Sequence, residues 1–118
     1  MERTITIDGR EVRLKSSAAL PRLYRIEYHR DILADMRMLA KALAKEDGQG
    51  ASHIPLEALG LFEDIAYLMA KHADPEAVPD TPEAWLDSFE TFSIYKVFPV
   101  IQELWAANLT TMASSKKK

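Results

Sequence analysis

The sequence contains no cysteine, only four glycines and no long uninterrupted apolar run. The lack of cysteine excludes a disulfide framework, a thiolate nucleophile and a thiolate zinc site. Every apolar run is shorter than the roughly 18–20 residues that a membrane-spanning helix needs. The first residues, Met1 to Thr4, also lack the apolar region of a signal peptide. We therefore expect a soluble protein of the cytoplasm.

Recognisable catalytic patterns are also missing. The three histidines (His29, His53 and His72) never lie three or four residues apart, so no H-E-x-x-H zinc motif exists. No glycine-rich phosphate loop and no G-x-S-x-G nucleophile elbow is present. The sequence therefore predicts a protein that is not an enzyme and that needs no cofactor or metal.

Charge is distributed unevenly along the 118 residues, whose net charge is −3. Residues 1–53 hold 10 basic and 8 acidic side chains, whereas residues 54–115 hold 2 basic and 10 acidic ones, and residues 116–118 are all lysine. An acidic surface repels phosphate backbones, so nucleic-acid binding would need the front half or the lysine tail. The acidic half could attract basic segments of a partner or keep the protein in solution.

The clearest local signal is a β-hairpin at the front of the chain. Thr4 to Ile7 and Arg10 to Lys15 alternate in polarity on either side of Asp8-Gly9. Asp-Gly favours a two-residue hairpin turn because both turn residues take positive φ. We expect one apolar face, formed by Ile5, Ile7, Val12 or Leu14, to be covered by helices.

Helical periodicity dominates the rest of the chain. The first predicted helix is capped by Ser16 and Ser17 and ends near His29. The second covers about 31–46 and is capped by Asp31, and the third covers about 54–73 and is capped by Ser52. A short fourth helix begins at Pro82, and the last covers about 92–112. Pro99 predicts a kink or break near 95–99 in the last helix. The predicted fold is α+β and mostly α, an N-terminal two-stranded hairpin followed by a four- to five-helix bundle. Residues 1–113 are predicted to form one domain, and 114–118 a flexible basic tail.

Aromatic residues are concentrated towards the end of the chain, and most of them are expected to form core. The last helix carries apolar residues beyond Trp105, with no later segment to cover them. Tryptophan and methionine in such a position favour a protein interface. The candidate protein-binding residues are Phe98, Trp105, Leu109 and Met112.

The order of these signals resembles a known family. In chain order they are an Ile-x-Ile-Asp-Gly-x-x-Val-x-Leu hairpin from Ile5 to Leu14, then Leu23-Tyr24-Arg25, Arg30 to Met36, Leu61 to Tyr67, Trp85 to Phe89, and Val100 to Leu109. The layout resembles that of the tail assembly chaperones of long-tailed phages and prophages of Gram-positive bacteria. The resemblance covers almost the whole chain and is one of loose pattern, without a sharp motif.

The resemblance implies a non-enzymatic role in the cytoplasm of the bacterial host. Such chaperones bind the tape measure protein, keep it soluble, help the tail tube protein to assemble around it, and are absent from the mature virion. Self-association of the chaperone is also expected. The alternative hypothesis is a regulatory adaptor that binds another protein through the same helical half, and a third is a small nucleic-acid-binding protein.

Overall fold

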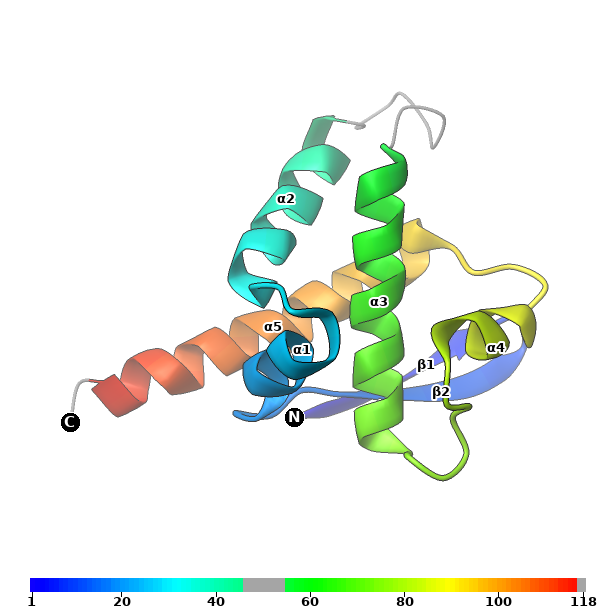
Figure 1. Cartoon of the computed structure of the whole chain (residues 1–118), viewed down its shortest axis with the longest axis horizontal. Coiled ribbons are helices and arrows are strands. Elements are labelled where there is room, and N and C mark those ends of the chain that lie inside the picture. The colour runs from blue at the N-terminus through cyan, green and yellow to red at the C-terminus, as the bar shows by residue number, and fades with distance from the viewer. Residues whose placement is uncertain (46–54, 117–118) are drawn as a thin grey trace.

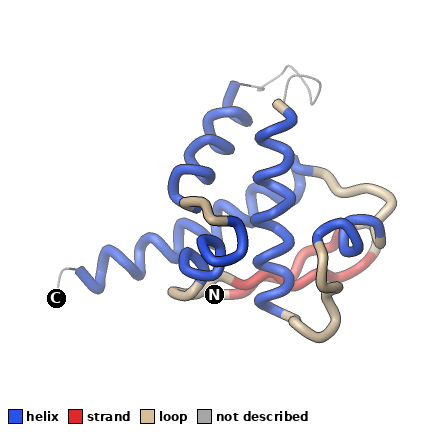
Figure 2. The backbone as a smooth tube through the Cα atoms, viewed as in Figure 1, coloured by secondary structure: helices blue, strands red, loops and turns tan. Residues whose placement is uncertain are grey.

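The computed structural model describes the backbone of residues 1–45 and 55–116, and the side chains of residues 1–44 and 55–109. In these residues two strands are followed by five helices (Figures 1 and 2). The elements are β1 (Glu2–Ile7), β2 (Arg10–Lys15), α1 (Leu20–Tyr28), α2 (Ile32–Lys45), α3 (Leu56–Ala73), α4 (Pro82–Asp87) and α5 (Ile94–Lys116). This arrangement confirms the predicted fold class.

The hairpin forms as its turn predicts. β1 and β2 pair antiparallel, with Ile5 opposite Val12, and the turn residues Asp8 and Gly9 have φ values of 56° and 77°. Because successive side chains in a strand point to opposite faces, the apolar residues gather on one side. Ile7, Val12 and Leu14 are buried on that side, and Ile5 is partly buried.

Helix α3 is the centre of the molecule. It crosses the hairpin and packs mainly on β2, while α5 packs on β1 (Figure 1). Nine of its residues are buried, which makes it apolar around most of its circumference. Helices α1, α2 and α4 also contact α3, so the core is shared by all of these elements. The C-terminal end of α5 extends beyond the other elements in Figure 1.

An aromatic cluster joins α3 to α4 and to the segment after it. Trp85 contacts Phe89 and Phe92 at ring-centroid distances of 5.4 and 5.2 Å, and Phe62 of α3 lies 5.4 Å from Phe92. The hairpin is attached here as well, because the guanidinium of Arg10 lies 4.0 Å above the Phe89 ring. These contacts place the short helix α4 against the hairpin.

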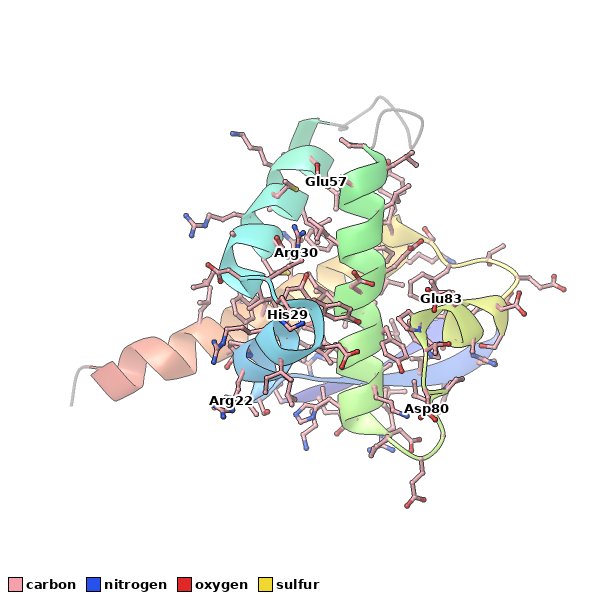
Figure 3. All side chains as sticks on the ribbon, viewed as in Figure 1. Arg22, His29, Arg30, Glu57, Asp80 and Glu83 are labelled. Atoms are coloured by element: carbon pink, nitrogen blue, oxygen red, sulfur yellow. The ribbon has the colours of Figure 1, made fainter. Side chains whose placement is uncertain are left out.

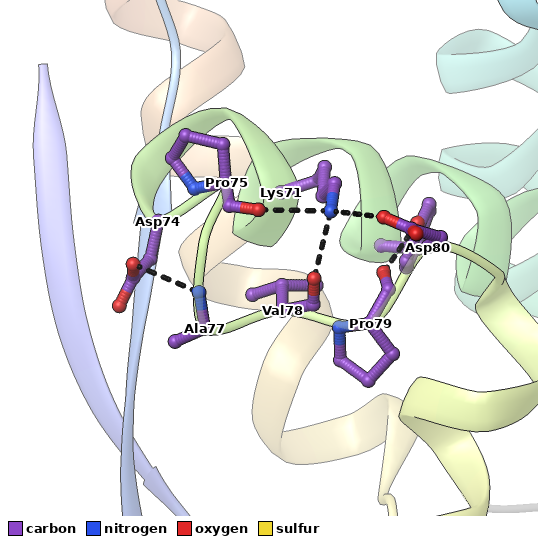
Figure 4. A network of polar contacts seen from close by, with 8 residues as sticks. Lys71, Asp74, Pro75, Ala77, Val78, Pro79 and Asp80 are labelled. Atoms are coloured by element: carbon purple, nitrogen blue, oxygen red, sulfur yellow. Dashed lines mark hydrogen bonds and ion pairs between the residues drawn. The ribbon is translucent and has the colours of Figure 1, made fainter.

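The loop between α3 and α4 is held by one lysine (Figure 4). Lys71 Nζ donates to the carbonyl oxygens of Pro75 and Val78, at 2.9 and 2.8 Å, and to Asp80 Oδ1 at 3.0 Å. Thr81 then caps α4, since its Oγ1 accepts a 3.1 Å hydrogen bond from the Ala84 amide. The predicted start of this helix at Pro82 is confirmed.

The predicted caps have mixed outcomes. Asp31 caps α2 as expected, because its Oδ1 accepts from the Leu33 amide at 3.0 Å. The prediction that Ser16 or Ser17 caps α1 is wrong: the N-cap is Ala19, which has no side-chain cap, and Ser17 Oγ accepts from the Ala19 amide just before the helix. Ser52 lies outside the described residues.

Of the predicted kink or break at Pro99, the break is wrong, since α5 continues through this residue, and the kink stays a prediction. Pro99 has no N–H, so the carbonyl of Tyr95 loses its usual donor. Tyr95 and Pro99 both lie on the exposed side of α5, where water can hydrate that carbonyl. In the described part of the chain, none of the helices combines the length and apolar character needed to cross a bilayer.

Candidate functional site

A predominantly apolar groove of about 490 Å³ lies between α2 and α5. Its walls and floor come from two segments far apart in the sequence. The lining residues are Leu33, Met36, Arg37 and Ala40 of α2, and Gln102, Trp105, Ala106 and Leu109 of α5. We call this the α2–α5 groove.

The groove follows from the helical repeat of both segments. On each helix the lining residues recur three or four positions apart, so each set forms one continuous stripe. Met36 and Trp105 are both only 5% exposed and form the floor, whereas Leu33 and Leu109 are 37% and 38% exposed and form the walls. The floor is therefore rigid core, and the walls present apolar surface to solvent.

One side of the groove is positively charged. Arg37 lines it, and Lys41 follows one turn later on the same exposed row of α2. Among the side chains that the structure describes, neither of these two cations forms an ion pair. The α5 side contributes no charged residue to the lining. The groove is thus apolar at its centre and cationic along its α2 side only.

A partly buried ionic contact joins α2 to the turn before it. Arg30, in the turn where α1 meets α2 (Figure 3), donates from Nε and Nη2 to the two carboxylate oxygens of Asp35, at 2.9 and 3.0 Å. Tyr24 of α1 donates to Asp35 Oδ2 at 2.6 Å. Burial alone would raise the pKa of Asp35, but the hydrogen bonds from Arg30 and Tyr24 outweigh it, and the pKa lies below its usual value. Asp35 therefore stays ionised and holds α2 against α1.

The sequence-predicted binding residues occupy different places. Trp105 and Leu109 lie together in the groove, as floor and wall. Phe98 is 3% exposed and belongs to the core. The side chain of Met112 lies outside the described residues. Trp105 and Leu109 are therefore two of the four residues that α5 gives to the groove, and α2 supplies the other four lining residues.

Sequence reasoning did not include the α2 side of the groove. Met36 and Ala40 were recognisable as members of an apolar stripe, but nothing local distinguishes a stripe that covers the core from one that borders a groove. Leu33 and Arg37 carry no sequence signal of this kind. Only the packing of α2 beside α5 brings these residues to Trp105.

No family model, curated protein or solved structure matches this chain.

Two of the three histidines lie among the described residues, and each has a structural place in the fold. His72 Nε2 lies 2.9 Å from Ser17 Oγ, and burial lowers the pKa of His72. His29 ends α1 in a left-handed conformation with φ of 58°, and His53 lies outside the described residues. In residues 1–44 and 55–109, whose side chains the structure describes, no cluster of three or more His, Asp or Glu side chains is arranged to hold a metal ion.

A pair of acidic residues on α3 has unusual titration behaviour. Burial, followed by the charge of neighbouring Glu63, raises the pKa of Asp64 to about 6. Burial also raises the pKa of Glu63. The Asp64 backbone carbonyl accepts a 3.4 Å hydrogen bond from the Tyr28 hydroxyl. Burial within the fold is thus the main cause of both shifts.

Proposed function

We propose that this protein is a tail assembly chaperone of a long-tailed phage or prophage, which binds the tape measure protein and acts without catalysis. The observation that carries the proposal is the α2–α5 groove, which holds Trp105 on its floor and Leu109 on its wall. The proposal also rests on the resemblance in layout described above.

The physical requirements of such a chaperone agree with the groove. A tape measure protein is long and largely helical, and it exposes apolar helix faces until the tail tube encloses it. An apolar groove between two helices is a common site for an amphipathic helix. One groove of this size gives a modest affinity, and several copies along one client raise the avidity while each contact can still be released.

Co-expression tests this proposal directly. The tagged protein would be expressed with the tape measure protein from the same gene cluster and purified by its tag. We expect the tape measure protein to be recovered with the wild type and to be lost with Leu109→Glu. Because Leu109 is 38% exposed, the change removes apolar contact without opening a core cavity.

Ile26→Glu is the matched control. Ile26 is an exposed apolar residue of α1, 58% accessible, and it does not line the groove. It should leave recovery unchanged, and circular dichroism should confirm that both variants are folded. If the wild type recovers no tape measure protein, the chaperone proposal is wrong. A regulatory adaptor would use the same groove, and in that case Leu109→Glu would abolish binding to a different protein.

A further inference from the structure

The charge of the α2–α5 groove is one-sided, and this restricts what can bind there. Arg37 and Lys41 are exposed, four residues apart, and without an ion-pair partner among the described side chains. Four residues correspond to about 6 Å along a helix axis. The α5 side offers Gln102 and Ala106, which carry no charge.

The groove-facing part of α5 adds no compensating acid. Its nearest acidic residue in sequence is Glu103, whose Oε2 already binds Arg3 Nη2 at 2.5 Å on β1. Arg30 cannot contribute to the cationic side either, because its guanidinium is held by Asp35. A ligand in the groove therefore meets apolar surface with Arg37 at one edge and Lys41 one helical turn beyond it, and neither cation has an ion-pair partner among the described side chains.

We propose that the groove takes an amphipathic helix with an apolar stripe and carboxylates at positions i and i+4 on the edge that faces α2. Apolar side chains of this helix would contact Leu33, Trp105 and Leu109, and its carboxylates would pair with Arg37 and Lys41. The inference rests on the proposed function for the identity of the occupant, a segment of the tape measure protein, and it adds the chemistry of that segment.

A second copy of this chain fits the groove less well. Of the ten acidic residues of the helical half, five lie on α3 and α4, four in the loops and one on α5. Helices α3 and α4 bury most of their apolar residues in their own core, and Glu103 of α5 is paired with Arg3. Nine residues of α3 are buried, as is Trp85 of α4. The apolar residues of α3 and α4 that are buried in this way are not accessible to the groove of another copy.

Two synthetic helical peptides of about 18 residues, long enough for measurable helix content, test the inference. Both carry the same leucine stripe; one has glutamates at i and i+4 along one edge, and the other has lysines there. Binding of the fluorescein-labelled peptides is followed by anisotropy at low ionic strength. We expect the lysine peptide to bind at least about fivefold more weakly than the glutamate peptide, and the difference to shrink in high salt.

Variants of the protein assign this preference to the groove. Arg37→Glu should abolish the preference, because the edge then carries one negative charge and the positive charge of Lys41, and Leu109→Glu should weaken both peptides. The matched control is Arg22→Glu, because Arg22 is exposed on α1 (Figure 3) and does not line the groove. Equal binding of the two peptides, no binding of either, or an equal effect of Arg37→Glu and Arg22→Glu would overturn the inference.

The outcomes separate this inference from the proposed function. If the tape measure protein co-purifies equally with wild type and Arg37→Glu, the chaperone proposal stands and the carboxylate-bearing helix is wrong. If the glutamate peptide binds as expected but the tape measure protein is not recovered, the groove chemistry stands and the chaperone proposal falls. Sedimentation that shows a wild-type dimer and a Leu109→Glu monomer would assign the groove to a second copy and overturn the inference.

Discussion

Tyr24 on α1 donates a 2.6 Å hydrogen bond to the buried carboxylate of Asp35 on α2. Tyr24 is completely buried and Asp35 is 5% exposed, so water cannot replace this bond. Burial, together with the neighbouring Asp35 carboxylate, raises the pKa of Tyr24, so its hydroxyl stays protonated and continues to donate. The pair sets the angle at which α2 leaves α1, and therefore the α2 side of the groove.

Tyr24→Phe should lower the free energy of unfolding by about 1.5–3 kcal/mol, the usual range for a hydrogen bond to a charged group. The ring stays in place, and Asp35 keeps its contacts to Arg30. Urea denaturation followed by circular dichroism measures the change. Tyr95→Phe is the control, since Tyr95 is 47% exposed and should contribute almost nothing. Equal stabilities of the two variants would contradict the role given to this bond.

Asp64 gives the fold a specific pH dependence. Its pKa in the folded state, about 6, lies above the unfolded value of about 4. Its contribution to stability is therefore fully present below pH 4 and is lost as the pH rises through 6, when the half-buried carboxyl ionises. Asp64→Asn removes this loss of stability. The melting temperature of the variant should therefore exceed that of the wild type at pH 7, and the difference should be smaller at pH 5.

Wild type and variant must be compared at each pH, because folding also raises the pKa of Glu63 and lowers the pKa of His72. Thermal melts of wild type and Asp64→Asn at the two pH values give the required difference. Asp87→Asn, at an exposed position on α4, controls for the loss of one negative charge. A gain that is the same at pH 5 and pH 7 would show that Asp64 does not titrate in this window.

Lys71 should be a main support of the loop between α3 and α4. Lys71→Met keeps much of the side-chain volume but leaves the carbonyls of Pro75 and Val78 without their donor. We expect a loss of about 1–2 kcal/mol of stability and faster amide exchange in residues 74–80. The control is Asp80→Asn, because the Asp80 side chain is 98% exposed and its ion pair with Lys71 is worth little. Unchanged exchange in Lys71→Met would remove Lys71 from this role.

Two glycines should respond to alanine in opposite directions. Gly60 lies inside α3, and a Cβ there would meet nothing within 4 Å, so Gly60→Ala should stabilise the protein by about 0.5–1 kcal/mol. Gly9 has the same free space but a φ of +77°, so Gly9→Ala should destabilise it by about 1–2 kcal/mol. Chemical denaturation of both variants checks the pair, and a loss of stability in Gly60→Ala would indicate an unseen requirement for glycine in α3.

Local signals were sufficient where the deciding interactions are local. The hairpin turn depends on two adjacent residues, Asp8 and Gly9, whose preference for positive φ is independent of the rest of the fold. The start of α4 depends on Thr81 and Pro82 in the same way. The sequence prediction was wrong at Ser16 and Ser17, where the contact of Ser17 with His72 accompanies a helix start two residues further on. The helix is also not broken at Pro99, where exposure lets it continue.

The sequence by itself determined the hairpin, the identity of most helices and the apolar character of the last one. Only the tertiary structure decided which apolar residues stay accessible. Phe98 and Leu109 follow the same helical pattern, yet the first is buried and the second borders the groove. The reason is that the exposure of a side chain depends on what packs against its helix. The segment beside Leu109 is α2, which lies about 70 residues earlier in the chain. The contact of Asp35 with Tyr24 and Arg30 holds α2 in that position.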